Sequence, residues 1–464
     1  MPEWRNKRPS ALADVPAPKP DAAEPVALTD DTLALRLHRV LDAMNRDGLD
    51  TLAIWCDLEH GSNFEYLTGF LTRFEEGLLV LQASGEACLV LGNENTKMAA
   101  HARLPARMLH CPFFSLPNQP MQGEQPLPQL MRQAGIEPGK HIGVVGWKLF
   151  TSAGMDNQRL FDLPAYVMDA LRQAAGDGEV VNATALMIGP EGVRRTNNAN
   201  EVAHYEYGSA LASDCVIRTM EALAPGVNEL ALADLMNAQG QRCSVVTICA
   251  TGPRYEQGNL YPRSRRLQVG DTVSMTCGYK GGLASRAGYA VSCAEELPCG
   301  AQDYLDRLVR PYFEAVTAWL ETIRIGMTGG ELYDLVDAVL PRSRYNWFLC
   351  PGHLTADEEW LCSPVYAGSA EPLRSGMLLQ IDIIPSVPGY GGVGCENGIL
   401  LADDTLQQEL QAQYPELWRR MCARRAWIRR HIGIRIPDEV LPLSSGVGYL
   451  RPYLMRKNSA MVCR

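Results

Sequence analysis

The sequence predicts a mixed α/β (α+β) protein built from two domains. The chain has 464 residues, more than one small hydrophobic core requires, so two domains are the natural expectation. In the first half, short aliphatic and β-branched runs alternate with amphipathic segments, which is typical of an α/β domain. In the second half, long helical patterns lie between strand-like segments, which indicates a second domain of mixed structure.

The first domain is expected over residues 29–190. Residues 1–28 are rich in Pro and Ala without apolar periodicity, so we expect a flexible or surface-bound arm before it. Residues 29–50 begin with a Thr/Asp cap and end near Gly48, as a helix does. The further predicted elements are strands at 51–56, 77–82, 86–92, 141–146 and 179–187 and a helix at 163–174.

The second domain is expected over residues 191–435, with a loop-like tail over 436–464. Its helices show apolar residues at helical spacing, and its strands are short apolar runs. The predicted helices are 197–223, 229–241, 301–323, 331–340 and 406–432. The predicted strands are 244–250, 271–282, 376–385 and 397–402.

Composition limits the kinds of binding partner and the cellular location that we expect for the protein. The formal net charge is −10 and the sequence pI is about 5.4, which argues against nucleic acid or an anionic membrane as the main partner. The N-terminus lacks the apolar segment of a signal peptide, and no apolar run is long enough for a membrane helix, so we expect a cytoplasmic protein. The 14 cysteines are scattered without a C-x-x-C pair, which favours reduced thiols.

One imidazole and two carboxylates stand in apolar surroundings. His353 follows PG in FLCPGHLT, Asp382 lies within LLQIDII, and Glu396 precedes NGILLA. A carboxylate in an apolar strand is costly without a cation or hydrogen-bond donors nearby. These three side chains are therefore candidates for an acid/base site or for a metal site, although each could also be a satisfied core residue.

Several motifs occur together in an order that resembles a known family. They are NFEYLTGF (63–70), VRRTNNANEVAHYEYGSALA (193–212), APGVNELAL (224–232), LQVGDTVSM (267–275), IRIGMTGGEL (323–332), GH (352–353), LRSGMLLQIDIIP (373–385) and CENGILLA (395–402). The chain resembles creatinase, prolidase, aminopeptidase P and methionine aminopeptidase over about residues 30–435. The resemblance implies a creatinase-type N-terminal domain, a C-terminal pita-bread domain and a homodimer.

The resemblance also implies a metal site, which this sequence matches only in part. Family metallopeptidases hold two metal ions with two Asp, one His and two acidic residues. His353, Asp382 and Glu396 match three of these positions, whereas Thr276 and Arg286 are aligned with the two Asp positions. A guanidinium among the carboxylates would supply positive charge where a metal would sit. We therefore expect a degenerate metal site and no cofactor, with one divalent metal on His353, Asp382 and Glu396 as the alternative.

Other residues are assigned to the site by the same resemblance. Asn259 stands where the family has a proton-handling histidine, and a second expected histidine falls near Trp360 or Leu361, in a stretch that carries an insertion. Arg73 and Phe74 follow the YLTGF segment, in a loop that reaches the active site of the partner subunit in creatinase. We expect Asn259, Arg73, Phe74 and Arg286 to bind substrate.

Two cysteines, Cys277 and Cys395, lie beside the inferred site. Each is either a small buried filler, which is the favoured interpretation, or a thiolate nucleophile activated by a neighbouring cation.

The predicted function is hydrolysis of a C–N bond, an amide or amidine, in a small polar substrate or short peptide, without the usual dinuclear metal centre. His353 would act as general acid/base, while Asp382, Glu396 and Arg286 hold substrate charge. Two alternatives remain open. One is a catalytically inactive homologue that binds a small molecule or a protein, and the other is an Xaa-Pro metallopeptidase with a modified metal site.

Overall fold

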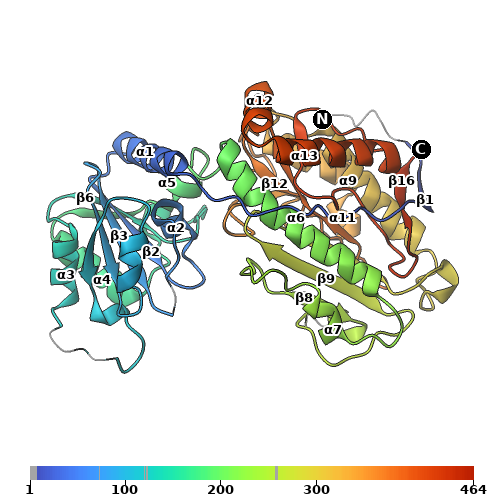
Figure 1. The fold of residues 1–464 in the computed structure, drawn as a ribbon, viewed down its shortest axis with the longest axis horizontal. Helices are drawn as coiled ribbons and strands as arrows, with labels where there is room; N and C mark the ends of the chain where they lie inside the picture. Colours follow the sequence, from blue (N-terminus) through green and yellow to red (C-terminus); the bar gives the residue numbers. More distant parts are fainter. Residues whose placement is uncertain (1–7, 73, 120, 122–123, 257–259) are drawn as a thin grey trace. The chain divides into compact units, whose positions relative to one another are not determined.

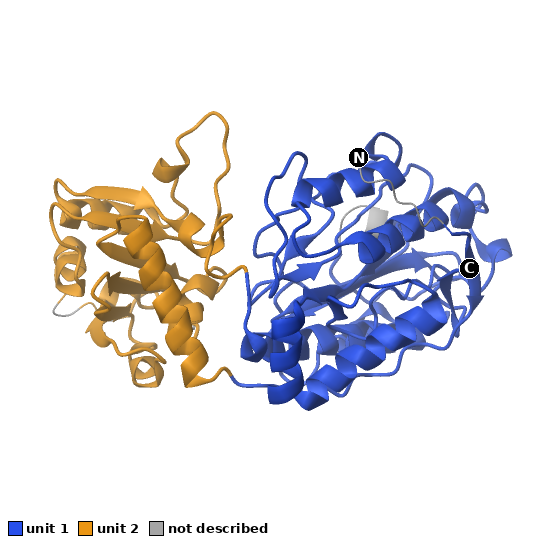
Figure 2. Cartoon of the chain, turned by 90° about the horizontal axis from the view of Figure 1, so that it is seen from above, with its two compact units in different colours: residues 1–27, 196–464 blue, residues 28–195 orange. Residues whose placement is uncertain are grey.

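The computed structural model describes residues 8–72, 74–119, 121, 124–256 and 260–464. The chain forms two compact units, shown in different colours in Figure 2. One unit comprises residues 28–195, and the other combines residues up to 27 with residues 196–464. Within the described ranges, no helix has both the length and the apolar character needed to cross a bilayer.

The 28–195 unit is built on a six-stranded sheet with the order β5-β4-β3-β2-β6-β7. Its strands are β2 (Thr51–Cys56), β3 (Gly77–Gln82), β4 (Ala87–Leu91), β5 (Arg107–His110), β6 (His141–Val145) and β7 (Glu179–Asn182). Strand β3 pairs antiparallel with β2 and β4, and the other pairs are parallel. Every residue of β2 is buried, which explains why TLAIWC is a continuous apolar run rather than an alternating one.

The helices of this unit are α1 (Asp30–Arg46), α2 (Ser62–Thr68), α3 (Leu127–Ala134), α4 (Ala165–Ala175) and α5 (Thr184–Ile188). The Thr29 side chain caps α1 by accepting a hydrogen bond from the Thr32 N–H. Helix α2 ends at Gly69, whose left-handed φ of 77° suits a residue without a Cβ. Helices α3 and α4 pack against each other and bury residues in the same core as the sheet.

The larger unit contains two four-stranded sheets, ordered β13-β10-β9-β8 and β11-β12-β14-β15. The first consists of β8 (Ile248–Thr251), β9 (Thr272–Tyr279), β10 (Gly282–Tyr289) and β13 (Gly394–Glu396). The second consists of β11 (His353–Leu354), β12 (Leu378–Gln380), β14 (Gly398–Leu401) and β15 (Val440–Pro442). All pairs in both sheets are antiparallel.

Long helices surround these sheets. They are α6 (Ala199–Ala222), α9 (Arg310–Thr322), α10 (Gly329–Val339), α12 (Asp404–Gln413) and α13 (Pro415–Trp427), with the shorter α7 (Glu229–Asp234), α8 (Pro253–Glu256) and α11 (Arg342–Tyr345). Helix α6 packs against β9 and β10, and Figure 1 shows it lying along that sheet. A capping box between Asn198 and Glu201 fixes the start of α6.

A tight hairpin joins β9 to β10 and sets the register of the first sheet. Tyr279 pairs with Gly282, so the turn consists of Lys280 and Gly281. Gly281 has a φ of 102°, and a Cβ there would lie 2.0 Å from the Tyr205 carbonyl oxygen of α6. Only glycine fits at position 281. The two-residue turn sets the pairing of β9 with β10, and this pairing determines which side chains lie on the same face of the sheet.

The N-terminal segment is part of the larger unit. Strand β1 (Ser10–Asp14) pairs antiparallel with β16 (Ser459–Cys463), so both ends of the chain meet in one two-stranded sheet. Further along, the Asp21 carboxylate accepts hydrogen bonds from Arg424 at 2.7 Å and from the Ser445 N–H at 2.9 Å. The flexible arm and the loop-like tail expected from composition are therefore wrong for these strands, because long-range pairing orders segments that have no local pattern.

Most predicted elements are present with shifted ends. The strands 51–56 and 77–82 match β2 and β3 at both ends. The predicted strand 179–187 is instead β7 followed by the short helix α5. The predicted strand 376–385 is regular only over β12.

Candidate active site

His353 lies at the centre of the candidate site and is fully buried. Oxygen atoms face both of its ring nitrogens. Nδ1 lies 3.2 Å from the Leu354 carbonyl oxygen, while Nε2 forms ion pairs with Glu359 Oε1 at 3.1 Å and with Asp382 Oδ2 at 4.0 Å. A ring whose two nitrogens both face oxygen acceptors is suited to carry a proton on each nitrogen.

The environment of His353 favours the charged ring. Burial alone would lower its pKa, but the negative charges of Glu359 and Asp382 outweigh burial and raise it. The Trp360 ring stacks on the imidazole with centroids 4.1 Å apart and planes 20° apart, which also favours a cation. These contacts favour the protonated form of the His353 ring.

Asp382 and Glu396 are buried carboxyl groups with different protonation behaviour. Burial raises the pKa of Asp382 to about 6, although the charge of His353 lowers it. Burial, together with the negative charges of Asp382 and Glu359, raises the pKa of Glu396 well above its usual range. A pKa of about 6 leaves Asp382 largely ionised near neutral pH, whereas the surroundings of Glu396 favour its protonated form.

Two hydroxyl groups share the sheet face of Glu396. Ser285 pairs with Glu396 across β10 and β13 and with Thr276 across β9 and β10, so the three side chains point to the same side. Thr276 Oγ1 and Ser285 Oγ are hydrogen-bonded at 2.6 Å. The sequence-based alignment placed Arg286, not Ser285, at this position.

Arg286 lies on the opposite face of the same sheet. It pairs with Met275 on β9 and with Cys395 on β13. Because it directly follows Ser285 in β10, its side chain points to the opposite face. Its five N–H groups donate to the carbonyl oxygens of Ser285, Glu396, Gly446 and Tyr449 and to the Asn397 side-chain oxygen. The expectation that its guanidinium lies among the carboxylates and binds substrate is wrong, because a one-residue step along a strand reverses the face. Its charge still lowers the pKa of Glu396 through space.

Asn259 and Arg73 lie outside the described residues. Phe74 is 67% exposed, with an unusual left-handed φ of 65°, on the 28–195 unit, and its role as a substrate contact remains a prediction. The neighbouring Glu75 is buried and accepts hydrogen bonds from the Glu94 and Leu116 N–H groups, so it supports its own unit.

Cys277 and Cys395 are both fully buried. Contact with Cys215 and burial raise the pKa of Cys277, and burial raises that of Cys395. Both thiols therefore behave as small buried side chains rather than as thiolates.

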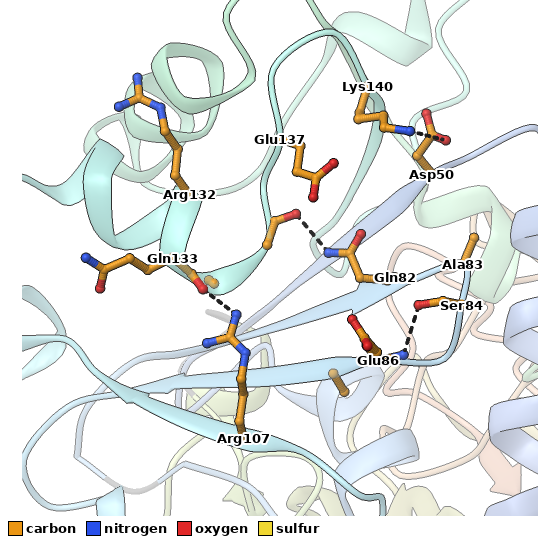
Figure 3. Close-up of a pocket in the computed structure, with 13 residues that line it drawn as sticks. Asp50, Gln82, Ala83, Ser84, Glu86, Arg107, Arg132, Gln133, Glu137 and Lys140 are labelled. Carbon is orange, nitrogen blue, oxygen red and sulfur yellow. Dashed lines mark hydrogen bonds and ion pairs between the residues drawn. The ribbon is translucent and has the colours of Figure 1, made fainter.

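A polar cleft in the 28–195 unit contains none of the predicted site residues (Figure 3). Its cationic groups already have partners within the unit. Lys140 pairs with Asp50 at 3.5 Å, and Arg107 donates to the Gln133 carbonyl oxygen. We assign no chemistry to this cleft.

Comparisons with known proteins agree with the two-unit architecture. The Creatinase/Prolidase N-terminal domain matches residues 36–188, and Metallopeptidase family M24 matches residues 203–403. The chain belongs to the creatinase/prolidase family. Its 28–195 unit is the creatinase-type N-terminal domain, and its larger unit is a pita-bread domain, as the sequence predicts.

Solved structures of this family share the fold. An Xaa-Pro dipeptidase from Bacillus anthracis aligns with a TM-score of 0.61 and 18% identity, over 80% of this chain and 96% of its own. A prolidase from Pyrococcus horikoshii OT3 aligns with a TM-score of 0.62 and 18% identity, over 79% of this chain and 95% of its own. A curated relative, the agropine synthesis cyclase of Rhizobium rhizogenes, is 22% identical over 403 residues, which span 81% of this chain and 94% of the relative.

The donors in this site do not fit the two metal ions that creatinase/prolidase metallopeptidases hold. Two adjacent divalent cations require several anionic oxygens, whereas Thr276 and Ser285 offer neutral hydroxyls that are bonded to each other. Both nitrogens of His353 lie near oxygen atoms, Nδ1 near the Leu354 carbonyl oxygen and Nε2 near the Glu359 carboxylate. Among the described residues, no group of three or more His, Cys, Asp and Glu side chains is arranged to hold a metal ion.

Proposed function

We propose that this member of the creatinase/prolidase family hydrolyses a C–N bond, an amide or amidine, in a small polar substrate or short peptide by acid–base chemistry without a dinuclear metal centre. One observation carries the proposal: the buried His353 ring lies against Glu359 and Asp382, while neutral hydroxyls on β9 and β10 flank Glu396. A charged imidazole beside ionised and protonated carboxyl groups is a combination suited to proton transfer in both directions.

Asp382 is the proposed base. Its Oδ2 faces His353 at 4.0 Å, and its buried Oδ1 has no hydrogen-bond partner among the described residues. A pKa of about 6 leaves it ionised near neutral pH and still basic enough to accept a proton. In the proposed reaction, Asp382 takes a proton from water as the oxygen attacks the substrate carbon.

His353 is the proposed acid. Its Nε2 proton passes to the leaving nitrogen as the C–N bond breaks, so the products are an amine and a carboxylic acid or its amide. The proton that Asp382 gained then returns to His353, across the 4.0 Å that separates Oδ2 from Nε2 or through one water. The ring and the carboxylate end the cycle in their starting states.

Glu396 and the hydroxyl pair are the proposed donors to the substrate oxygen or nitrogen. Burial raises the pKa of Glu396 and so favours its protonated form, which can donate a hydrogen bond. Thr276 and Ser285 have two hydroxyl hydrogens between them, and their mutual bond uses one. The other hydrogen is free to stabilise negative charge that develops in the transition state.

The test is a turnover screen of the purified full chain against small amides, amidines and Xaa-Pro dipeptides, before and after chelator treatment. We expect turnover that survives the chelator. His353→Gln should lower kcat by about 100-fold or more, the usual scale of acid–base catalysis. His101→Gln, at an exposed histidine, is the matched control. Turnover that is lost with the chelator and restored by metal would overturn the proposal and support the modified metallopeptidase instead.

Ring closure is a second candidate, favoured by the match to agropine synthesis cyclase. The same proton transfers would operate, with a nucleophile of the substrate itself in place of water. Mass spectrometry separates the two reactions, because the two products of hydrolysis together contain one water more than the substrate, whereas a cyclisation that expels water or an amine incorporates no water. Binding of screened compounds without turnover in either assay would support an inactive homologue.

The homodimer and the cytoplasmic location remain predictions of the family resemblance and of the N-terminal composition. The acidic net charge of −10 supports a small-molecule or short-peptide substrate over nucleic acid or membrane partners. Size-exclusion chromatography with light scattering tests the dimer directly.

A further inference from the structure

The segment between β11 and Cys362 forms a closed loop over His353. The Leu354 N–H donates to the Cys362 carbonyl oxygen at 2.7 Å, and the Leu361 N–H donates to the Leu354 carbonyl oxygen at 2.9 Å. These two bonds close the base of the loop directly beside the catalytic candidate. Residues 355–361 therefore cannot move independently of His353.

The same loop is attached to the β9–β10 turn and to α6. The Gly281 N–H donates to the Ala356 carbonyl oxygen at 2.6 Å, and Thr355 Oγ1 donates to the Gly281 carbonyl oxygen at 3.1 Å. Asp357 is buried, accepts a hydrogen bond from the Tyr205 hydroxyl at 3.0 Å and pairs with Lys280 at 3.4 Å. A loop fixed at its base and at its start presents its later residues in one arrangement.

Those later residues are Glu359 and Trp360, which contact the imidazole from different directions. Glu359 reaches Nε2 with its carboxylate at 3.1 Å, and Trp360 covers the ring plane with centroids 4.1 Å apart. The Leu354 carbonyl oxygen meets Nδ1 at the other side of the ring. Rotation of the ring by half a turn would exchange nitrogen for carbon at both contacts, so the contacts select one orientation.

We infer that Glu359 is a positioning residue, which fixes the His353 ring so that Nε2 faces Asp382 and the substrate. The inference rests on the proposed function for its catalytic meaning, but the contact itself can be tested without any substrate. Glu359 acts through His353 and does not itself exchange protons with substrate. It differs from the carboxylate of a catalytic triad, which meets the other ring nitrogen, because it lies beside Nε2, the nitrogen whose proton is transferred. The position was missed in the sequence because it lies in an apparent insertion.

The first test is proton NMR of the full chain at fixed pH without substrate. A ring proton on the buried Nε2, placed 3.1 Å from the half-buried Glu359 carboxylate, is shielded from exchange and gives a signal downfield of the amide region, and its loss in His353→Gln assigns it. We expect the signal in the native protein and in Glu358→Gln, the neighbouring control, and its loss or large upfield shift in Glu359→Gln. Persistence of the native signal in Glu359→Gln would overturn the inference.

The second test is kinetic and uses whichever substrate the screen identifies. Glu359→Gln should lower kcat by about 10-fold or more with little change in KM, and Glu359→Asp should recover part of the loss. Equal kcat values in Glu359→Gln and Glu358→Gln would contradict the positioning role. If no substrate is turned over, the proposed function fails, whereas the NMR result still decides whether Glu359 holds the ring.

The variant Asp357→Asn, which weakens the loop attachment, should shift the NMR signal of the His353 Nε2 proton by a smaller amount than Glu359→Gln does.

Discussion

The two faces of the β9–β10–β13 sheet carry polar residues of opposite character. On the face that packs toward α6, Arg286 is buried and all five of its N–H groups have acceptors. On the other face, Glu396 holds a raised pKa, and nearby Asp382 keeps an oxygen without a hydrogen-bond partner among the described residues. Completed hydrogen bonding indicates a structural role for Arg286, whereas the open hydrogen-bonding capacity of Asp382 is what the proposed function requires of a base.

The largest effect expected from this comparison is a gain of metal binding. The double variant Thr276→Asp, Ser285→Asp places two carboxylates on the face of Glu396, so we expect it to retain divalent metal after purification, measured by plasma mass spectrometry. Arg286→Asp should not do so, because that side chain faces away from the site. Metal retention by Arg286→Asp and not by the double variant would reverse the assignment of the two faces.

The next effect is a loss of stability. Arg286→Met removes the donors of four carbonyl groups and of the Asn397 side chain, so the free energy of unfolding should fall by about 3–5 kcal/mol. Urea denaturation measures the change. Arg107→Met, at an exposed arginine of the other unit, is the control and should change stability by less than about 1 kcal/mol. A loss under about 1 kcal/mol in Arg286→Met would contradict its structural role.

The smallest effect is a change in pH dependence at Asp382. Its pKa of about 6 in the folded protein exceeds its ordinary value of 3.8, so the folded state binds the proton more tightly than the unfolded state. The stability contributed by this proton is present below pH 4 and is lost as the pH rises toward about 6. Asp382→Asn should remove this fall and leave the protein more stable above pH 6, by about 1 kcal/mol or more, while abolishing turnover. An unchanged pH profile of stability in Asp382→Asn would contradict the raised pKa.

The sequence was sufficient for elements whose signals are local. Strands β2 and β3 were predicted at their exact ends because continuous apolar runs flanked by turn residues are strong signals. His353, Asp382 and Glu396 were found because family motifs surround them. In the fold, Asp382 lies just after β12 and Glu396 lies at the end of β13, and both carboxyl groups interact electrostatically within one cluster that includes His353.

The error at Arg286 has a physical cause that the sequence contained. The turn Tyr279-Lys280-Gly281-Gly282 allows a two-residue connection, and counting outward from it pairs Thr276 with Ser285. An alignment that ignored the turn slipped by one residue and therefore chose the wrong face. Glu359 was beyond local reasoning, because its contact with His353 depends on a loop attached to α6 and to the β9–β10 turn.

The pairing of β1 with β16 also governs the order in which the protein is assembled during translation. Residues 28–195 can collapse as soon as they leave the ribosome, because every strand of their sheet is present by then. Strand β1 is synthesised before the other strands of the described residues, yet its partner is Ser459–Cys463, so it must wait until residues 15–463 have been synthesised. The domain that carries the site thus closes last, and a chain cut short at its C-terminus leaves an unpaired strand edge at its N-terminus.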